Sequence, residues 1–310
     1  MFSRRNWIRT GLMAAPAVGL AQANEDGCGI AIGTYGLQSM PLAGAIDLIA
    51  ATGFNAFEIT VFPGTTGDPA EFLRTDEQIG AVREQIAGSG LRLSALMADL
   101  RPEEDDKKHL EQLSELRTLI ELARALAPDD PPLIQTILGG KDWETSKTLF
   151  RDRLADWNRV LADQKGYLSI KPHRSHAMSV PENAVWLLNQ LGNPRRLRMV
   201  YDFSHYAFLE PERKIDETVA VALPITNYVA VKDAGIVDGK VRFDLVGESG
   251  NWNHADIIKA FYEGGYRGDF CCEVSSQIWR SDPAYDPEAA TVTCFKNLKA
   301  AFDEAGVPAV

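Results

Sequence analysis

Residues 166–173 read Gly-Tyr-Leu-Ser-Ile-Lys-Pro-His, a short apolar run that ends abruptly in charged and polar side chains. The same arrangement returns at Val200-Tyr-Asp-Phe-Ser-His205, at Tyr228-Val-Ala-Val-Lys-Asp233 and at Cys272-Glu273. Short runs rich in β-branched and aromatic residues are typical of buried strands. The charges that follow them mark one end of a parallel sheet, where ligands bind in α/β folds.

Eight strands of this kind are predicted, and their starts recur at intervals of roughly 30 to 40 residues, the length of one strand–helix unit. They cover residues 30–35, 56–62, 92–98, 133–138, 167–170, 198–201, 227–231 and 269–274. Eight units in about 285 residues indicate an α/β fold, a closed (β/α)8 TIM barrel, as a single domain over residues 24–310. A doubly wound open sheet is the alternative, but no Gly-x-Gly-x-x-Gly motif follows the first strand.

The clearest helix is predicted over residues 106–127, where apolar residues recur at helical spacing. Its expected buried stripe consists of Leu110, Leu113, Leu116, Leu119, Leu122, Ala123 and Leu126. His109 and His176 are expected on the solvated surface, and His254 at the start of a later helix.

The first 23 residues form a predicted export signal. Arg4 and Arg5 precede a short apolar stretch at 11–21, and Ala21-Gln22-Ala23 forms a cleavage site. This order resembles a twin-arginine signal, which is read by the Tat machinery that exports folded proteins. The apolar stretch is too short to span a bilayer, so no membrane anchor is expected. We predict cleavage after Ala23 and a periplasmic or secreted mature protein.

The composition excludes some classes of partner. The chain has 43 Asp and Glu against 32 Lys and Arg, a net charge of −11, and removing the three arginines of the signal would make it −14. Such a surface repels phosphate backbones and anionic lipids, so nucleic acid is not an expected partner. The cysteines are too few for a disulfide scaffold and lack Cys-x-x-Cys spacing, so reduced, buried thiols are expected at Cys28, Cys271, Cys272 and Cys294.

Polar side chains gather at the predicted strand ends, which share one mouth in a barrel. They are Glu58, Asp99, Lys171, His173, Arg174, Asp202, His205, Lys232, Asp233 and Glu273. Aromatic rings follow several strands, Trp279 among them, and flat rings suit the C–H faces of a sugar. The loops after the last two strands supply little positive charge, which favours a neutral sugar over a phosphorylated one; Arg174 and Arg280 are the candidate anion contacts.

Taken in order on consecutive strands, the four motifs quoted above resemble the strand-end motifs of the xylose isomerase-like barrels. That superfamily holds sugar-phosphate isomerases, ketose 3-epimerases, inosose dehydratases and metal-dependent AP endonucleases. The resemblance implies proton abstraction next to a carbonyl or hydroxyl-bearing carbon, with two glutamates as acid and base. It also implies a divalent metal, Mn²⁺, Mg²⁺ or Zn²⁺, that holds two substrate oxygens.

Two positions depart from that pattern. Lys171 stands where the resemblance implies a metal-binding, catalytic Glu, and Ala230 where it implies a metal-binding His. Only Asp202 and Glu273 match metal positions, and two carboxylates make a poor site for a tightly held ion. The ammonium group of Lys171 would restore positive charge beside them, and the two acids would raise its pKa. We therefore hypothesise a site that is cationic without a metal.

Three residues are predicted to be catalytic: Lys171 as an acid or electrostatic anchor, and Glu273 or His173 as the base. The predicted substrate-binding residues are Glu58, Asp202, His205, Lys232 and Trp279. Among them, the resemblance matches His205 to a substrate-contacting histidine and Lys232 to a residue that orients the site. The alternative is a purely structural ion-pair network of Lys171, Asp202 and Glu273.

The sequence favours an exported enzyme of the isomerase, epimerase or eliminating-lyase type that acts on a sugar or keto-sugar by proton abstraction. Two alternatives stay open: a carbohydrate-binding barrel without catalysis, and a keto-glycoside lyase or hydrolase. A DNA-repair endonuclease fits the fold, but the negative charge, the export signal and the missing metal ligands oppose it. The sequence leaves open whether the protein forms an oligomer.

Overall fold

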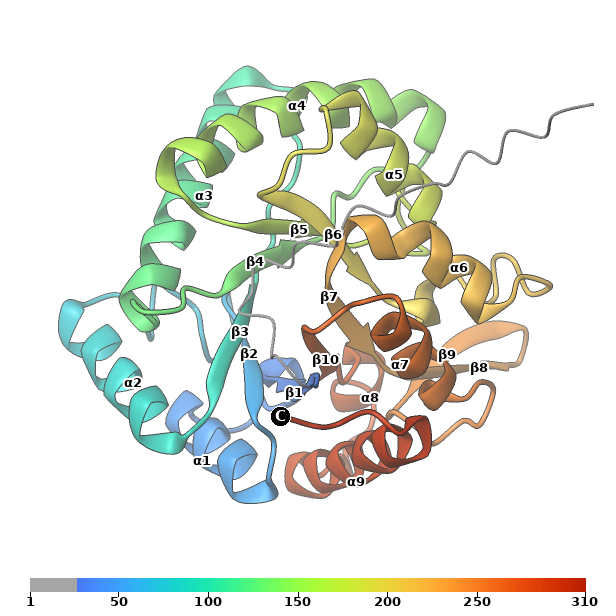
Figure 1. Ribbon diagram of the computed structural model, residues 1–310. Coiled ribbons are helices and arrows are strands. Elements are labelled where there is room, and N and C mark those ends of the chain that lie inside the picture. The colour runs from blue at the N-terminus through green and yellow to red at the C-terminus, as the bar shows by residue number, and fades with distance from the viewer. Residues whose placement is uncertain (1–26) are drawn as a thin grey trace, which may run out of the picture.

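The computed structural model describes residues 27–310, so the predicted export signal lies outside the described residues. Eight parallel strands close into a barrel, and a ring of helices surrounds it (Figure 1). The barrel strands are β1 (Gly29–Gly33), β2 (Ala56–Thr60), β3 (Arg92–Met97), β4 (Leu133–Thr136), β5 (Leu168–Ile170), β6 (Leu197–Tyr201), β7 (Thr226–Val231) and β10 (Asp269–Cys272). The predicted (β/α)8 barrel is confirmed, and the open-sheet alternative is wrong because β10 pairs with β1 and closes the sheet.

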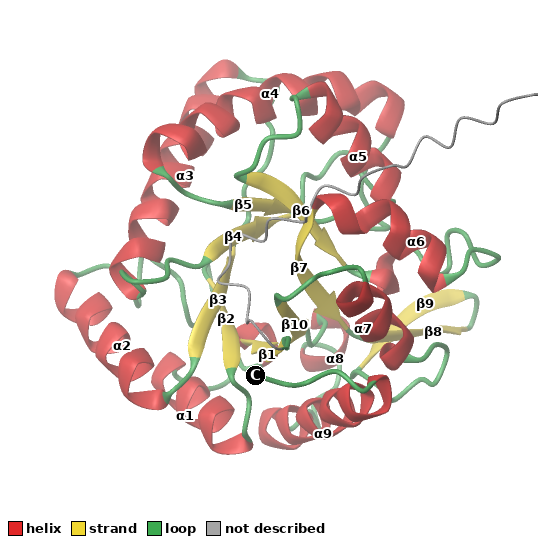
Figure 2. Ribbon diagram, in the orientation of Figure 1, coloured by secondary structure: helices red, strands yellow, loops and turns green. Residues whose placement is uncertain are grey.

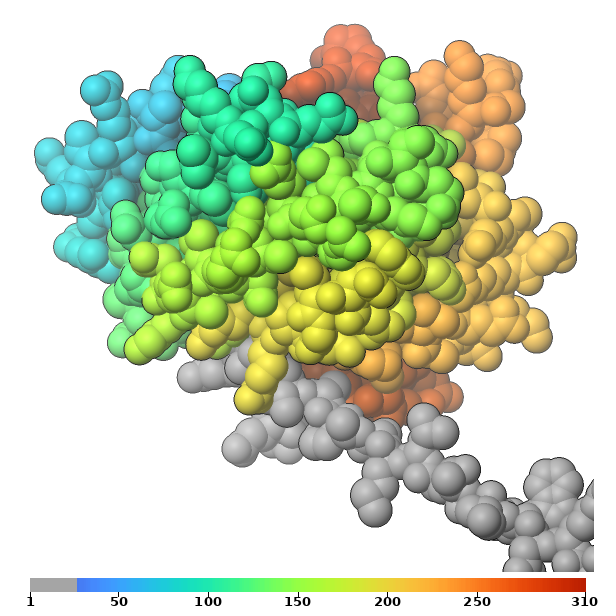
Figure 3. Space-filling view, turned by 90° about the horizontal axis from the view of Figure 1, so that it is seen from above, coloured from blue at the N-terminus to red at the C-terminus, as the bar shows by residue number. Residues whose placement is uncertain are grey.

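The helices cover the outside of this barrel (Figure 2). They are α1 (Leu42–Thr52), α2 (Asp76–Ser89), α3 (Asp106–Leu126), α4 (Trp143–Gln164), α5 (Pro181–Gln190), α6 (Ile215–Ala222), α7 (His254–Glu263), α8 (Ser276–Trp279) and α9 (Pro287–Ala305). Residues of α3, α4 and α5, drawn from green to yellow in Figure 3, form a continuous outer wall. No helix among residues 27–310 has the length and apolar character needed to cross a bilayer.

Side-chain oxygens fix where several helices begin. Thr75 and Gln78 form a capping box at the start of α2, and the carboxylate of Asp105 accepts a hydrogen bond from the backbone N–H of Lys108 at the start of α3. Each cap satisfies a backbone donor that the first helical turn leaves free. His254 is the first residue of α7, as predicted.

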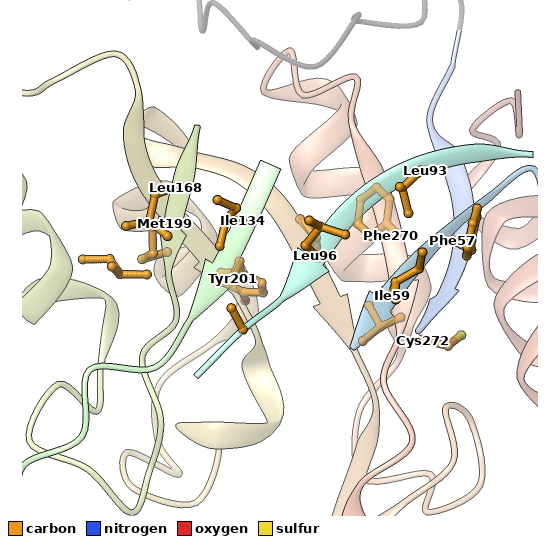
Figure 4. Close-up of a cluster of buried hydrophobic side chains, with 14 of the residues drawn as sticks. Phe57, Ile59, Leu93, Leu96, Ile134, Leu168, Met199, Tyr201, Phe270 and Cys272 are labelled. Atoms are coloured by element: carbon orange, nitrogen blue, oxygen red, sulfur yellow. The ribbon is translucent and has the colours of Figure 1, made fainter. Parts of the chain in front are cut away.

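Strand alternation divides the core into two regions. Side chains such as Phe57, Ile59, Leu96, Met199 and Phe270 belong to one large apolar cluster that includes the helices (Figure 4). Alternate strand residues form a second, smaller cluster inside the barrel: Ala31, Ala56, Ala95, Leu133, Val200, Tyr228, Ala230 and Cys271. Many of these inner residues are small, which leaves room for the polar side chains at the next inward positions along the strands.

Two expectations for α3 are wrong. Leu110, expected in the buried stripe, is 64% exposed, and His109, expected on the surface, is 4% exposed. His109 precedes Leu116 by two helical turns and therefore lies on the core-facing side, whereas Leu110 is rotated by about 100° away from it. The Nε2 atom of His109 lies 2.8 Å from a carboxylate oxygen of Asp156 on α4, which gives this nitrogen of the buried ring a hydrogen-bond partner.

A hairpin that the sequence reading missed follows β7. Its strands are β8 (Asp233–Val237) and β9 (Lys240–Asp244), paired antiparallel. The turn residues Asp238 and Gly239 have φ of 50° and 71°, the left-handed conformation that a two-residue hairpin turn requires. The Asp-Gly pair was the local signal for this hairpin.

Candidate functional site

Four charged residues follow four barrel strands at inward-facing positions. Lys171, Asp202, Lys232 and Glu273 come directly after β5, β6, β7 and β10. Each lies two residues beyond an inward strand position, Ala230 before Lys232 and Cys271 before Glu273, so strand alternation directs its side chain to the barrel axis. All four side chains lie at the carboxyl end of the barrel, the mouth predicted from the sequence.

The ammonium group of Lys232 lies at the centre of this cluster. Its Nζ atom is 2.7 Å from Asp202 Oδ2, 2.6 Å from Glu273 Oε1 and 3.3 Å from His205 Nε2. Lys171 donates to the other oxygen of Glu273, and its Nζ lies 3.7 Å from Asp202 Oδ2. Two ammonium groups thus neutralise two carboxylates, which makes the cluster a closed network of charge-assisted hydrogen bonds.

These contacts set the protonation states of Lys171 and Glu273. Burial would raise the pKa of Glu273, but the ammonium groups of Lys171 and Lys232 outweigh it and hold that pKa below its usual range. Burial would lower the pKa of Lys171, but Glu273 and Asp202 raise it above the ordinary value, as predicted. At neutral pH the pair is therefore an ammonium and a carboxylate.

Two histidines whose rings contact each other lie beside the cluster in neutral form. Burial lowers the pKa of His173 to about 3, and the nearby Lys171 and Lys232 charges contribute to the shift. Burial also lowers the pKa of His205 well below its ordinary value. Their ring centroids are 4.0 Å apart. The backbone N–H of Ser175 donates to His173 Nδ1 at 3.3 Å, so the proton of the neutral ring is assigned to Nε2.

A cavity of about 270 Å³ opens above the cluster. Its wall contains all three predicted catalytic residues, Lys171, His173 and Glu273. The rest of the wall is a mixture of apolar, amide and charged side chains: Tyr35, Phe62, Met97, Ala98, Asp99, Arg101, Gln135, Thr136, Ile137 and Arg280. A cavity of this size and mixed lining suits a molecule of roughly one sugar ring.

The five predicted substrate-binding residues lie behind that wall. Asp202 and Lys232 are the fully buried members of the cluster, and buried His205 contacts Lys232; none of the three lines the cavity. Trp279 packs edge-to-face against Tyr35, with ring centroids 5.4 Å apart, and so supports the wall from outside. Glu58 lies deeper in the barrel than the wall, where the side-chain amide of Gln135 donates to its carboxylate. Their roles in binding stay predictions.

Sequence reasoning missed Gln135 and Arg101 as wall residues. Gln135 is an inward polar residue inside the apolar strand β4, and a polar residue within an apolar run was its signal. Arg101 follows Asp99 at the end of β3, and its Nε donates to that carboxylate at 2.8 Å. His176, expected in solvent, is half-buried, and its ring contacts that of His173 with ring centroids 4.7 Å apart.

The hairpin β8–β9 covers one side of the charged cluster. Phe243 on β9 lies 5.2 Å from Lys232 Nζ and 5.3 Å from the ring of His205, measured to its ring centroid. Asp233, the first residue of the hairpin, accepts from Ser249 at 2.8 Å and lies 2.5 Å from Nε2 of His254. These bonds fasten the hairpin to α7, which keeps an apolar ring over the buried ammonium group.

Glu58 gives the stability of the protein a pH dependence. Burial raises the pKa of Glu58 to about 7, although Lys171 and the Gln135 hydrogen bond oppose the shift. Between the unfolded pKa of 4.5 and the folded value, the folded chain holds a proton that the unfolded chain releases, so stability falls as pH rises through this range. We expect ionisation of Glu58 to lower the unfolding free energy of the parent by roughly 2–3 kcal/mol between pH 5 and pH 8. Glu58→Gln has no ionisable group at this position and should not show this fall.

Denaturant unfolding of parent and variant at the two pH values measures this effect. The variant should gain stability relative to the parent at pH 8 only. Glu121→Gln, the same chemical change on an exposed helical side chain, is the matched control and should show no such dependence. An equal difference in unfolding free energy at both pH values would rule out a buried, protonated Glu58.

Residues 46–302 match the sequence profile of the xylose isomerase-like TIM barrel family. The chain belongs to this family. No curated protein matches it. The sequence resemblance to xylose isomerase-like barrels is confirmed.

Several solved structures share the fold at low sequence identity. An L-ribulose 3-epimerase aligns with a TM-score of 0.69 at 17% identity, over 90% of this chain and 96% of that one. The 3-keto-D-glucoside 4-epimerase of E. coli aligns with a TM-score of 0.64 at 14% identity, over 89% and 100%. A fusion of a xylose isomerase-like TIM barrel with a 4-hydroxyphenylpyruvate dioxygenase aligns with a TM-score of 0.72 at 16% identity. The alignment covers 90% of this chain but only 43% of the fusion protein.

The divalent metal implied by the family fits these residues poorly. Asp202, His205 and Glu273 do place three donor atoms within 4.8 Å of one another. However, Lys232 Nζ lies 2.6–3.3 Å from donor atoms of all three, and Lys171 contacts Glu273 as well. An ion bound to this trio would lie against a buried ammonium group, and the two like charges would repel strongly at low dielectric.

Proposed function

We propose that the protein is a sugar isomerase or epimerase type of enzyme that moves a proton on a sugar or keto-sugar without a metal ion. The family and its epimerase neighbours support a sugar isomerase/epimerase-like role. One observation supports a reaction without a metal ion: two lysine ammonium groups contact the carboxylates that would otherwise hold the ion. They supply fixed positive charge where a carbonyl oxygen becomes negative.

The proposed chemistry starts when a substrate carbonyl oxygen accepts a hydrogen bond from Lys171. Lys171 then shares its ammonium group with the substrate, which weakens its hold on Glu273 and raises the basicity of that carboxylate. Glu273 takes the proton from the carbon next to the carbonyl, and the C–H electron pair forms an enediolate. The ammonium group stabilises the new oxyanion.

Reprotonation decides the product. A proton returned to the opposite face of the same carbon gives an epimer. A proton delivered to the former carbonyl carbon, with transfer of the hydroxyl proton of the enediolate to the neighbouring oxyanion, gives an isomer. Loss of a leaving group from the next carbon gives an elimination product. Neutral His173 donates its Nε2–H to a substrate hydroxyl or carbonyl oxygen, because its low pKa keeps it from becoming a cation. Lys171 and His173 thus offer one cationic and one neutral donor at the reacting carbons.

The keto-glycoside alternative has some support from the fold comparison, since one neighbour is a 3-keto-D-glucoside 4-epimerase. Epimerisation and elimination share the enediolate, so both need the same Lys171 and Glu273. The carbohydrate-binding alternative keeps the cavity and lacks turnover.

Proton exchange in D2O tests the proposal directly. The mature chain is incubated with ketoses, aldoses and 3-keto-glucosides, and deuterium incorporation next to the carbonyl is followed by NMR. We expect incorporation into at least one class of substrate, at the same rate before and after EDTA treatment, and less than about 0.1 equivalent of divalent metal in the purified protein.

The outcomes separate the parts of the proposal. Sugar binding by calorimetry without any exchange would indicate the carbohydrate-binding barrel. Exchange that EDTA abolishes and Mn²⁺ or Zn²⁺ restores would disprove metal independence while keeping the enzyme class. The absence of both binding and exchange would reject the sugar-directed function.

We also propose that the mature enzyme works in the periplasm or is secreted by the Tat machinery. The support is the order of charged, apolar and cleavage segments in residues 1–23. Fractionation of expressing cells should find a chain that begins after Ala23 outside the cytoplasm, and full-length protein confined to the cytoplasm would refute export.

A further inference from the structure

The wall of the cavity carries an uncompensated positive charge. It contains three cations, Arg101, Lys171 and Arg280, and two carboxylates, Asp99 and Glu273. Lys171 is paired with Glu273, and Arg101 is paired with Asp99. Within residues 27–310, Arg280 makes no ion pair. The wall is therefore positive by one charge, in a chain whose net charge is −11.

The position of Arg280 suits a ligand contact. It directly follows α8, is exposed, and lines the cavity. Its guanidinium carbon lies 4.6 Å from the ring centroid of Trp279, and this stacking restrains the side chain. A planar guanidinium held on an aromatic face presents its N–H groups at the edge, in the geometry that pairs with a carboxylate.

Arg101 adds further donors on the same wall. Only its Nε is engaged by Asp99, at 2.8 Å, so its terminal nitrogens are open to a ligand. Both arginines are more exposed than Lys171, which is 5% exposed at the base of the cavity. The cavity thus has an anion-binding rim above a buried proton-transfer pair.

We propose that the substrate is a sugar acid, a sugar or keto-sugar that carries one carboxylate. The carboxylate pairs with Arg280, and the carbonyl or carbinol carbon reaches Lys171 and Glu273. This inference rests on the proposed function and names its substrate class. A single carboxylate matches the single uncompensated charge, whereas a phosphate dianion would leave its second charge unmatched and face Asp99 and Glu273.

The apolar part of the wall agrees with a compact sugar acid. Tyr35 and Phe62 stack edge-to-face with ring centroids 5.9 Å apart and offer flat surfaces for the C–H faces of a ring. The amide of Gln135 is in the same wall, and its carbonyl oxygen is buried without a hydrogen-bond donor among the described residues. A ligand hydroxyl would satisfy that oxygen.

Matched ligand pairs test the proposal. Calorimetry compares D-glucuronate, D-galacturonate and D-mannuronate with glucose, galactose and mannose, each pair differing only in the carboxylate. We expect at least one uronate to bind about tenfold or more tightly than its neutral partner at low salt. The preference should shrink as NaCl is raised, because the rim is exposed to solvent.

Arg280→Gln should reduce the uronate-to-neutral affinity ratio by about tenfold, and Arg280→Lys should keep part of it. Arg196→Gln is the matched control, since Arg196 also stacks on an aromatic ring, with its guanidinium carbon 4.7 Å from the Tyr167 centroid, but is absent from the cavity wall. This control should preserve the ratio.

Three results would overturn the proposal. Neutral sugars that bind or exchange as well as the uronates would reject the sugar-acid class and leave the proposed function standing. A ratio unchanged by Arg280→Gln would show that Arg280 does not contact the carboxylate. Failure of both members of every pair to bind or exchange protons would reject the sugar-acid class, whereas the proposed function is rejected only if the ketoses and 3-keto-glucosides fail as well.

Discussion

Lys171→Met should lower the rate of proton exchange into the substrate by about 10²- to 10³-fold, with a small change in KM. Methionine keeps much of the length and packing of lysine and removes the ammonium group. The oxyanion that forms on proton abstraction then loses its nearest cationic donor. Glu273 keeps one partner, Lys232 at 2.6 Å, so its carboxylate is not left unpaired and the fold should persist.

The measurement is single-substrate exchange kinetics in D2O, with the thermal midpoint recorded for every variant. Lys299→Met is the control, because Lys299 makes an exposed ion pair with Asp303 on α9 and its loss should leave the rate unchanged. Lys171→Arg keeps the charge with a different shape and should recover part of the activity. A rate within tenfold of the parent for Lys171→Met would mean that Lys171 is only a structural ion-pair partner.

The fold could be predicted because its signals are local and repeated. Each strand is a short apolar run, most of these runs end in charged residues, and their starts recur at roughly 30 to 40 residues, so closure of the barrel follows from the count. The hairpin β8–β9 was not predicted because it is inserted after Lys232, between a barrel strand and its helix, and so does not follow the strand–helix repeat. The Asp238-Gly239 pair indicates its turn. The predicted burial of His109 and Leu110 is reversed in the structure. Adjacent residues on a helix point about 100° apart, and the regular spacing of the leucines suggested the wrong one of the two as the buried residue.

The site could be predicted only as a set of residues at one mouth. Strand alternation brings Lys171, Asp202, Lys232 and Glu273 together, but sequence does not give the depth of each side chain. The sequence predicts that Lys171 replaces the metal. In the structure, Lys232 lies between the two carboxylates, and Lys171 lines the cavity. Glu58 ends below the wall for a similar reason, since it lies inside β2 rather than after it.

Restoring the two departures from the family pattern should create a divalent-metal site. We expect the double substitution Lys171→Glu with Ala230→His to bind about one equivalent of Mn²⁺ or Zn²⁺, where the parent binds almost none. The introduced carboxylate and imidazole would join Asp202 and Glu273 as four ligands, a sufficient set for either ion. Ala230 is an inward residue of β7 two positions before Lys232, so an imidazole there faces the same space.

The change in charge is the main reason to expect metal binding by the double variant. Exchanging an ammonium group for a carboxylate changes the buried cluster by two negative charges, and a divalent cation restores the balance. Elemental analysis after dialysis measures the metal, and the thermal midpoint should rise with metal concentration, since an ion at 1,000 times its Kd adds about 4 kcal/mol to folding stability.

The single variants make the result interpretable. Ala230→His alone should stay free of metal, because Lys171 still contacts Glu273 and no third carboxylate is present. Lys171→Glu alone should bind metal weakly, because it lacks the imidazole that completes the four ligands. Lys232 remains between Asp202 and Glu273 in every variant, so the ion has to displace its ammonium group from those carboxylates, and we expect only the full ligand set to do so. A folded double variant that takes up no ion would show that the ends of β5 and β7 do not superimpose on the family's metal positions, and the charge-replacement argument for Lys171 would fail with it.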